Sequence, residues 1–193
     1  KAIADVASEE GVDQFVFSGV GSHDEDTGVP HFDSAGEIDE YVRDLDLPWT
    51  ILKPVFFMEN LEAFAEDIVE DGPGDPAGQL GDCPHPVVEH IGELRVALPL
   101  AGSVGLQMVT YDDLGHAAAV AIANPEEFVG ESIDLAGDER SLAETAEILT
   151  EVTGRDVEAV HVPIEDAYET FGEEFTVMCE WFNQVGYSAD VPA

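Results

Sequence analysis

The stretch His31-Phe-Asp-Ser-Ala-Gly-Glu-Ile-Asp-Glu-Tyr41 decides the fold, because it predicts an amphipathic helix between two apolar runs. The runs at residues 12–17 and 49–52 are rich in β-branched and aromatic side chains, which is typical of strands, and Pro54 ends the second. Strand, helix, strand is a βαβ unit. It predicts a parallel sheet covered on both faces, with ligands bound at the carboxyl ends of the strands.

The start of this helix is predicted at about Asp33. Asp33 or Ser34 can cap it, and Glu37 follows Ser34 at the spacing of a capping box. The rest of the chain predicts further strands at 94–98, 107–110, 133–135 and 157–162, and helices at 1–10, 58–71, 112–123, 142–152, 164–171 and 173–185.

Six segments of the chain carry a family resemblance: FVFSGV (15–20), PHFDS (30–34), EIDEY (37–41), LPWTILKPVFFMEN (47–60), MVTYDDLGHA (108–117) and GESIDLAG (130–137). In this order and spacing they resemble the NmrA-like family, atypical short-chain dehydrogenase/reductase relatives that bind NAD(P). The resemblance covers nearly the whole chain. It implies an α/β fold: the C-terminal part of a Rossmann-like doubly wound parallel sheet plus a smaller α/β substrate lobe.

The domain boundary is expected in a Gly/Pro-rich loop that begins at Gly72 and runs to Pro86. By the resemblance, residues 1–71 form the end of the NAD(P)-binding Rossmann domain. Residues 72–193 form mostly the substrate lobe and C-terminal helices, with some strands returning to the sheet.

The Gly-rich phosphate loop of such proteins has no match in the sequence. Gly19-Val20-Gly21 follows a strand, but the third glycine position holds Asp24, and the acids at 24–26 would repel a pyrophosphate. The chain therefore resembles a member lacking its N-terminal Gly-rich segment. We expect full binding of NAD or NADP to need that segment. We also expect that the exposed edge of the 12–17 strand makes the chain associate, for example as a homo-oligomer, or leaves it unstable alone.

The catalytic positions carry unusual residues. In catalytic relatives a Tyr, and a Lys four residues later, relay a proton and hold the nicotinamide ribose; here His31 and Ala35 occupy the matching positions. A methyl group can do neither task. His31 is a candidate acid or base, or a structural His that bonds its own loop. Ser18 matches the substrate-orienting Ser, although a Ser at a strand end often only satisfies a turn.

Cofactor contacts are implied by the resemblance on both sides of the helix. Lys53 could contact cofactor or substrate, or form a surface ion pair. Phe57 could line the same pocket or belong to a helix core. The implied cofactor-binding residues are Ser18, Gly19, Val20, Pro54, Val55, Phe56 and Asn60.

No metal site is expected. Cys83, His85, Glu89 and His90 are close in sequence, but their spacing matches no standard zinc motif. Two cysteines in a chain of this length indicate a reducing compartment, and no apolar run reaches membrane-spanning length. We expect a cytoplasmic protein with no membrane partner, in which Cys179 is a helix-core thiol.

Charge is the other strong feature of the composition. Forty-three acidic residues against six basic ones give a formal net charge of -37, while 45% of the residues are hydrophobic. The chain can therefore bury a core beneath an acidic surface, which indicates a salt-rich, halophilic setting. Direct binding to nucleic acid is disfavoured, because phosphate neutralisation needs clustered Lys and Arg.

Two functions remain open on these grounds. The first is a nucleotide-sensing or regulatory protein, in which NAD(P) occupancy alters association with a protein partner without efficient turnover. The alternative is an NAD(P)H-dependent oxidoreductase or a nucleotide-sugar epimerase-like enzyme, in which the cofactor performs the hydride chemistry.

Overall fold

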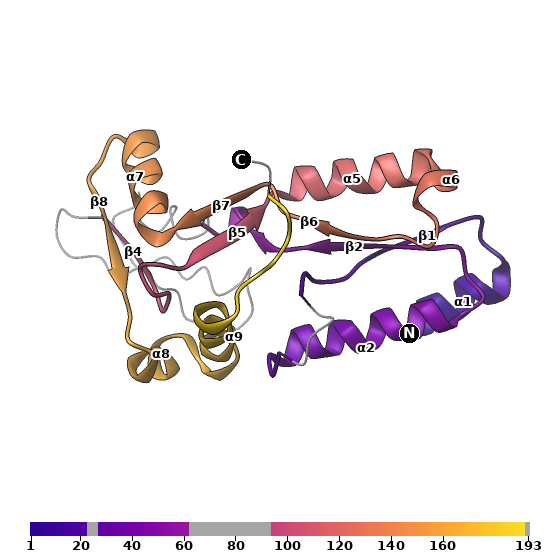
Figure 1. Ribbon diagram of the computed structural model, residues 1–193, viewed down its shortest axis with the longest axis horizontal. Helices are drawn as coiled ribbons and strands as arrows, with labels where there is room; N and C mark the ends of the chain where they lie inside the picture. Colours follow the sequence, from indigo (N-terminus) through magenta and orange to yellow (C-terminus); the bar gives the residue numbers. More distant parts are fainter. Residues whose placement is uncertain (23–26, 62–93, 192–193) are drawn as a thin grey trace. The chain divides into compact units, whose positions relative to one another are not determined.

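The computed structural model describes residues 1–22, 27–61 and 94–191, and the chain forms two compact units (Figure 1). The first unit contains residues 1–57, 107–138 and 187–193, and the second contains residues 58–106 and 139–186. Each unit is described by itself.

A three-stranded parallel sheet forms the centre of the first unit. Its strands are β1 (Phe15–Ser18), β2 (Trp49–Pro54) and β6 (Ser132–Leu135), in the order β1-β2-β6. Phe15 is in register with Trp49, and Leu52 with Ile133. The central strand β2 is buried at every position after Trp49. The parallel βαβ unit predicted from the sequence is confirmed.

Helices lie on both faces of this sheet. Figure 1 shows α5 (Tyr111–Ala123) on the opposite side from α1 (Ala2–Glu10) and α2 (Pro30–Asp44). The α1/α2 side holds a core cluster of buried Ala4, Ala7, Val42 and Leu47, with Val12, Phe15, Ile38, Leu45 and Trp49 packed against it.

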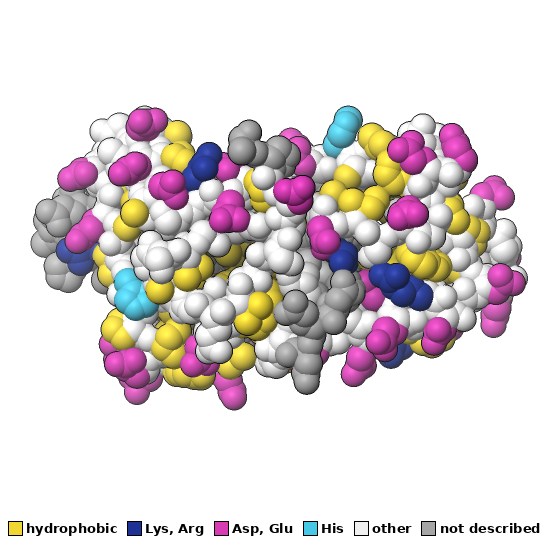
Figure 2. Space-filling view, viewed as in Figure 1, with side chains coloured by type: hydrophobic (Ala, Val, Ile, Leu, Met, Phe, Trp, Pro, Cys, Tyr) yellow, Lys and Arg dark blue, Asp and Glu magenta, His cyan; other side chains and the backbone are white. Residues whose placement is uncertain are grey.

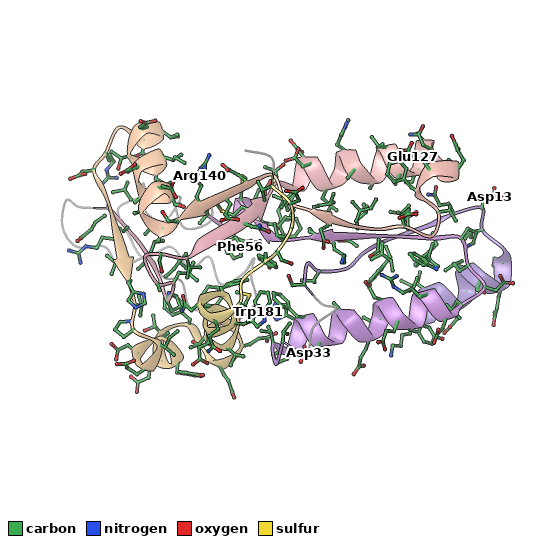
Figure 3. All side chains as sticks on the ribbon, viewed as in Figure 1. Asp13, Asp33, Phe56, Glu127, Arg140 and Trp181 are labelled. Carbon is green, nitrogen blue, oxygen red and sulfur yellow. The ribbon has the colours of Figure 1, made fainter. Side chains whose placement is uncertain are left out.

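Helix α2 begins earlier than the sequence predicted. Pro30 occupies its first turn and no side chain caps it, so the expected cap at Asp33 or Ser34 is wrong. Proline fits the first turn because its missing N–H would have no helical partner there. Asp33 instead accepts hydrogen bonds from the backbone N–H and the hydroxyl of Thr27. The loop residue Thr27 is thereby hydrogen-bonded to the first turn of the helix. Asp33 is labelled in Figure 3.

A second sheet has the strand order β3-β5-β7, and β3 pairs in parallel with β5, with Phe56 in register with Met108. The sequence analysis did not predict β3, β7 or the helix α6. All three are too short to show the repeat of apolar residues that marks a helix or a strand in a sequence. The bounds are β3 (Phe56–Phe57), β5 (Gly105–Val109), β7 (Asp138–Ser141) and α6 (Pro125–Phe128).

The second unit is built on a parallel strand pair, in which Val96 of β4 is in register with Ala159 of β8. Helix α7 packs on both strands and starts with a capping box between Ser141 and Glu144. Trp181, Phe182 and Cys179 are buried on one helix, as expected for a core thiol. The bounds are β4 (Leu94–Leu98), β8 (Val157–His161), α7 (Leu142–Thr153), α8 (Ile164–Phe171) and α9 (Glu173–Gln184).

Acidic side chains are dispersed over the surface. On the face drawn in Figure 2 they lie among few Lys and Arg and form no single patch. Within residues 1–22, 27–61 and 94–191, no helix combines the length and the apolar character needed to cross a membrane. The helix predicted at 58–71 lies outside the described residues beyond Leu61.

Candidate functional site

The turn after β1 is held against the end of β2 at the carboxyl edge of the first sheet. The N–H of Gly19 donates to the Leu52 carbonyl at 2.8 Å, and the N–H of Gly21 donates to the Pro54 carbonyl at 2.8 Å. Val55 continues β2 and donates its own N–H to Leu135 at 3.1 Å. The structure thus brings the Ser18–Val20 and Pro54–Val55 candidates together.

Gly21 lies in a tightly packed space. A Cβ built there would lie 3.2 Å from Val55 Cγ1, 3.4 Å from the Pro54 carbonyl oxygen and 3.4 Å from Tyr187 Cδ1. Glycine therefore allows the turn to approach the strand closely. Ser18, by contrast, is exposed, and its hydroxyl is accessible to a ligand at this edge.

The inward face of α2 carries Ala35 and Asp39, one turn apart. Both are buried, at 8% and 1% exposure. A Cβ on Gly19 would lie 3.0 Å from Asp39 Oδ1, so this carboxylate contacts the backbone just after β1. A buried carboxylate on a helix with many surface acids was not predicted. Position 35 offers only a methyl group on this same face.

His31 lies at the surface in the first turn of α2. Its ring packs edge-on against Phe32, with ring centroids 4.6 Å apart. Phe32 itself is 2% exposed. His31 is thus anchored by an aromatic contact and exposed to solvent.

Lys53 is 6% exposed, and its Nζ lies 3.1 Å from Asp134 Oδ1. The two residues are in register on neighbouring strands β2 and β6, which explains the pairing. Of the two roles proposed from sequence, the ion pair is present. Its lysine is buried because β2 is the central strand, whereas the Asp134 side chain on β6 is 46% exposed.

The segment after Pro54 divides between the two units. Phe56, labelled in Figure 3, is buried in β3. Phe57 also lies in β3, with its ring centroid 4.3 Å from that of Tyr111, so its assignment to a helix core is wrong. Asn60 belongs to the second unit and is half-buried.

The sequence analysis missed one member of this region, Tyr187. Residues 187–191 rejoin the first unit, where the Tyr187 ring lies beside Gly21 and has its centroid 6.1 Å from that of Phe32. Burial raises the pKa of the Tyr187 phenol above its usual range. The only local signal is Gly186, whose positive φ of 74° allows a sharp change of direction after α9.

Within the described part of the chain, no three His, Cys, Asp or Glu side chains gather as a metal site would need. Cys83, His85, Glu89 and His90 lie outside the described residues.

Comparison with protein families gives a match to the model of the NmrA-like family over residues 1–192. This match covers more than half of the chain and includes every site residue described above.

Several solved structures share the fold. Triphenylmethane reductase of Citrobacter sp., complexed with NADP(H), has a TM-score of 0.72 and 18% identity, over 97% of this chain and 61% of that one. NmrA, a negative transcriptional regulator, complexed with NADP, has a TM-score of 0.68 and 18% identity, over 95% of this chain and 55% of that one. The NADPH-dependent quinone oxidoreductase of Escherichia coli, complexed with NADPH, has a TM-score of 0.68 and 16% identity, over 94% of this chain and 59% of that one. The chain spans between 55% and 61% of the length of these proteins.

Proposed function

Since this chain belongs to the NmrA-like family, we propose that it binds the nicotinamide end of NAD or NADP and acts as a nucleotide-sensing or regulatory protein without efficient turnover. Solved proteins of similar fold hold NADP, NADP(H) or NADPH, and one of them is a transcriptional regulator.

The residues at the carboxyl edge fit the nicotinamide half of such a nucleotide. The Gly19–Gly21 turn lies at the carboxyl edge of β1 and β2, and Ser18 beside it has an exposed side chain that carries a hydroxyl. No Gly-rich phosphate loop occurs among the described residues. These residues therefore fit the nicotinamide riboside and provide no cradle for the pyrophosphate.

The observation that carries the absence of turnover is the buried methyl group of Ala35. An amine at this point of the helix would donate hydrogen bonds to the ribose and favour proton transfer. Alanine does neither. The Asp39 carboxylate one turn later cannot donate a hydrogen bond when ionised, so it does not replace the amine.

The proposal is tested by measuring binding and turnover on the same protein in 2 M KCl. Reduced nicotinamide mononucleotide should bind, and NADPH should bind within about threefold of the same affinity, because the described residues add no contact to the second phosphate. AMP should not compete. Oxidation of NADPH with quinones should stay at background. Steady turnover by the unmodified chain would contradict the sensor proposal.

Ala35→Lys should tighten binding of reduced nicotinamide mononucleotide by about tenfold or more, because one charge-assisted hydrogen bond is worth about 1.5 kcal/mol or more net. Asp39 would compete for this amine at the i, i+4 spacing, so Ala35→Lys with Asp39→Asn should bind more tightly than Ala35→Lys alone. Titration calorimetry measures both.

Ala119→Lys is the matched control, since it adds the same charge at an exposed position of α5. It should leave affinity unchanged. Equal affinities for Ala35→Lys and the unmodified chain would show that position 35 does not face the ribose.

An NAD(P)H-dependent oxidoreductase is the second candidate, favoured by the solvent-exposed side chains of Ser18 and His31 in the same unit. In that case turnover should be measurable in the unmodified protein. His31→Ala should abolish it and leave nucleotide affinity intact.

A further inference from the structure

The C-terminal residues of the first unit return to the turn that follows β1. The ring of Tyr187 is the contact: its Cδ1 lies 3.4 Å from the point where a Gly21 Cβ would be. Val55 Cγ1 approaches the same point to 3.2 Å. A ring from the end of the chain and a side chain following β2 therefore flank one turn.

A two-point clamp holds this segment in place. The Gln107 amide donates to the Ala189 carbonyl at 2.9 Å and accepts from the Ala189 N–H at 3.1 Å. Gln107 is 4% exposed, so both hydrogen bonds are shielded from water. Tyr187, two residues earlier, is thereby fixed against the sheet by a side chain of β5.

The Tyr187 ring has a second aromatic ring as a neighbour. The buried ring of Phe32 lies 6.1 Å away, centroid to centroid, at an interplanar angle of 37°. Such distances are typical of interacting aromatic pairs. The Tyr187 ring is thus one member of an aromatic wall, defined here as Phe32 and Tyr187, beside the glycine turn.

We propose that Tyr187 is a ligand-contacting residue, whose ring forms the wall against which the planar nicotinamide packs at the Gly21–Val55 turn. This inference rests on the proposed function and adds a residue from outside its motifs. A planar ring packs well against the face of a phenol ring, whereas a charged phosphate does not. The contact depends on the ring of Tyr187, and the Gln107 clamp sets its position.

The first test observes the contact directly. The chain contains four tyrosines, so 3-fluorotyrosine labelling should give few ¹⁹F resonances, and loss of a signal in Tyr187→Phe assigns the one of interest. Saturating reduced nicotinamide mononucleotide in 2 M KCl should shift the Tyr187 resonance. Tyr168 is the internal control, since it is exposed on α8 and bonded to Glu180, and its resonance should not move.

The second test measures affinity. Tyr187→Leu removes the aromatic plane and keeps apolar volume, and should weaken binding of the mononucleotide by about tenfold, whereas Tyr187→Phe should weaken it less than about threefold. Tyr168→Leu should leave affinity unchanged. Unfolding midpoints in the same buffer show whether each variant is folded; if Tyr187→Leu is not, the ¹⁹F shift and Tyr187→Phe decide.

The outcomes separate the two levels of the proposal. Failure of the unmodified chain to bind any nicotinamide nucleotide overturns the proposed function and this inference together. Binding with an unmoved Tyr187 resonance overturns this inference alone, as does a folded Tyr187→Leu variant of full affinity. A shifted resonance together with the ranked affinities supports it.

Discussion

Raising KCl from 0.1 M to 2 M should raise the thermal unfolding midpoint of this chain by about 10 °C or more, because screening recovers several kcal/mol and each is worth about 2–4 °C at this size. The source of the effect is the net charge of -37. At about 1 M salt the Debye length is about 3 Å, so repulsion between neighbouring surface carboxylates is largely removed. Circular dichroism against temperature measures the midpoint.

Sucrose provides the control for this experiment. It favours compact states through exclusion from the protein surface, with no screening of charge. Sucrose at the same water activity as 2 M KCl should therefore give a much smaller rise. A midpoint that does not respond to KCl would remove the argument for a salt-rich setting.

Removing the acidic partner of the buried Lys53 amine should have the largest effect of any single substitution discussed above. Asp134→Asn should lower the free energy of unfolding by about 2–4 kcal/mol, because it leaves the buried Lys53 ammonium without a counter-charge. This lies somewhat below the usual cost for a fully buried pair, since the amide oxygen still accepts a hydrogen bond. Lys53→Met should cost less, because the Asp134 carboxylate that it leaves behind is 46% exposed and can be hydrated.

The matched control is Glu37→Gln, which removes the acid of an exposed ion pair. Lys1 Nζ lies 3.9 Å from Glu37 Oε2, and both side chains are largely exposed, so this loss should cost less than about 0.5 kcal/mol. Urea unfolding in 2 M KCl measures all three variants. Similar values for Asp134→Asn and Glu37→Gln would show that burial of the Lys53 amine does not raise the cost of losing its partner.

The sequence predicted those helices and strands in which apolar residues recur at the spacing of a helix or a strand. The β1-α2-β2 unit and the helices α5, α7, α8 and α9 show apolar repeats over several turns, and they lie where expected. The start of α2 was misplaced because Pro30 opens the helix with no capping side chain. Strands β3 and β7 have too few residues for a period, and pairing with β5 fixes them.

The candidate site was predictable only in its contiguous parts. The turn at Gly19 and the segment after Pro54 follow strands directly, and a parallel sheet brings strand ends to one edge. The burial of Asp39 was not predicted, since nothing in the neighbouring sequence distinguishes it from the surface acids of the same helix. Tyr187 is 166 residues from Gly21 in the sequence, and no local pattern relates the two.

The discontinuity of the first unit has a consequence for how the chain matures. The turn at Gly21 is synthesised before every residue of the second unit, and Tyr187 after all of them. Domains generally fold as units during synthesis, starting from the N-terminus, and a unit assembled from distant segments folds slowly because of its high contact order. A nascent chain therefore holds an unfinished site until residues 187–191, which follow the whole of the second unit in the sequence, have been synthesised.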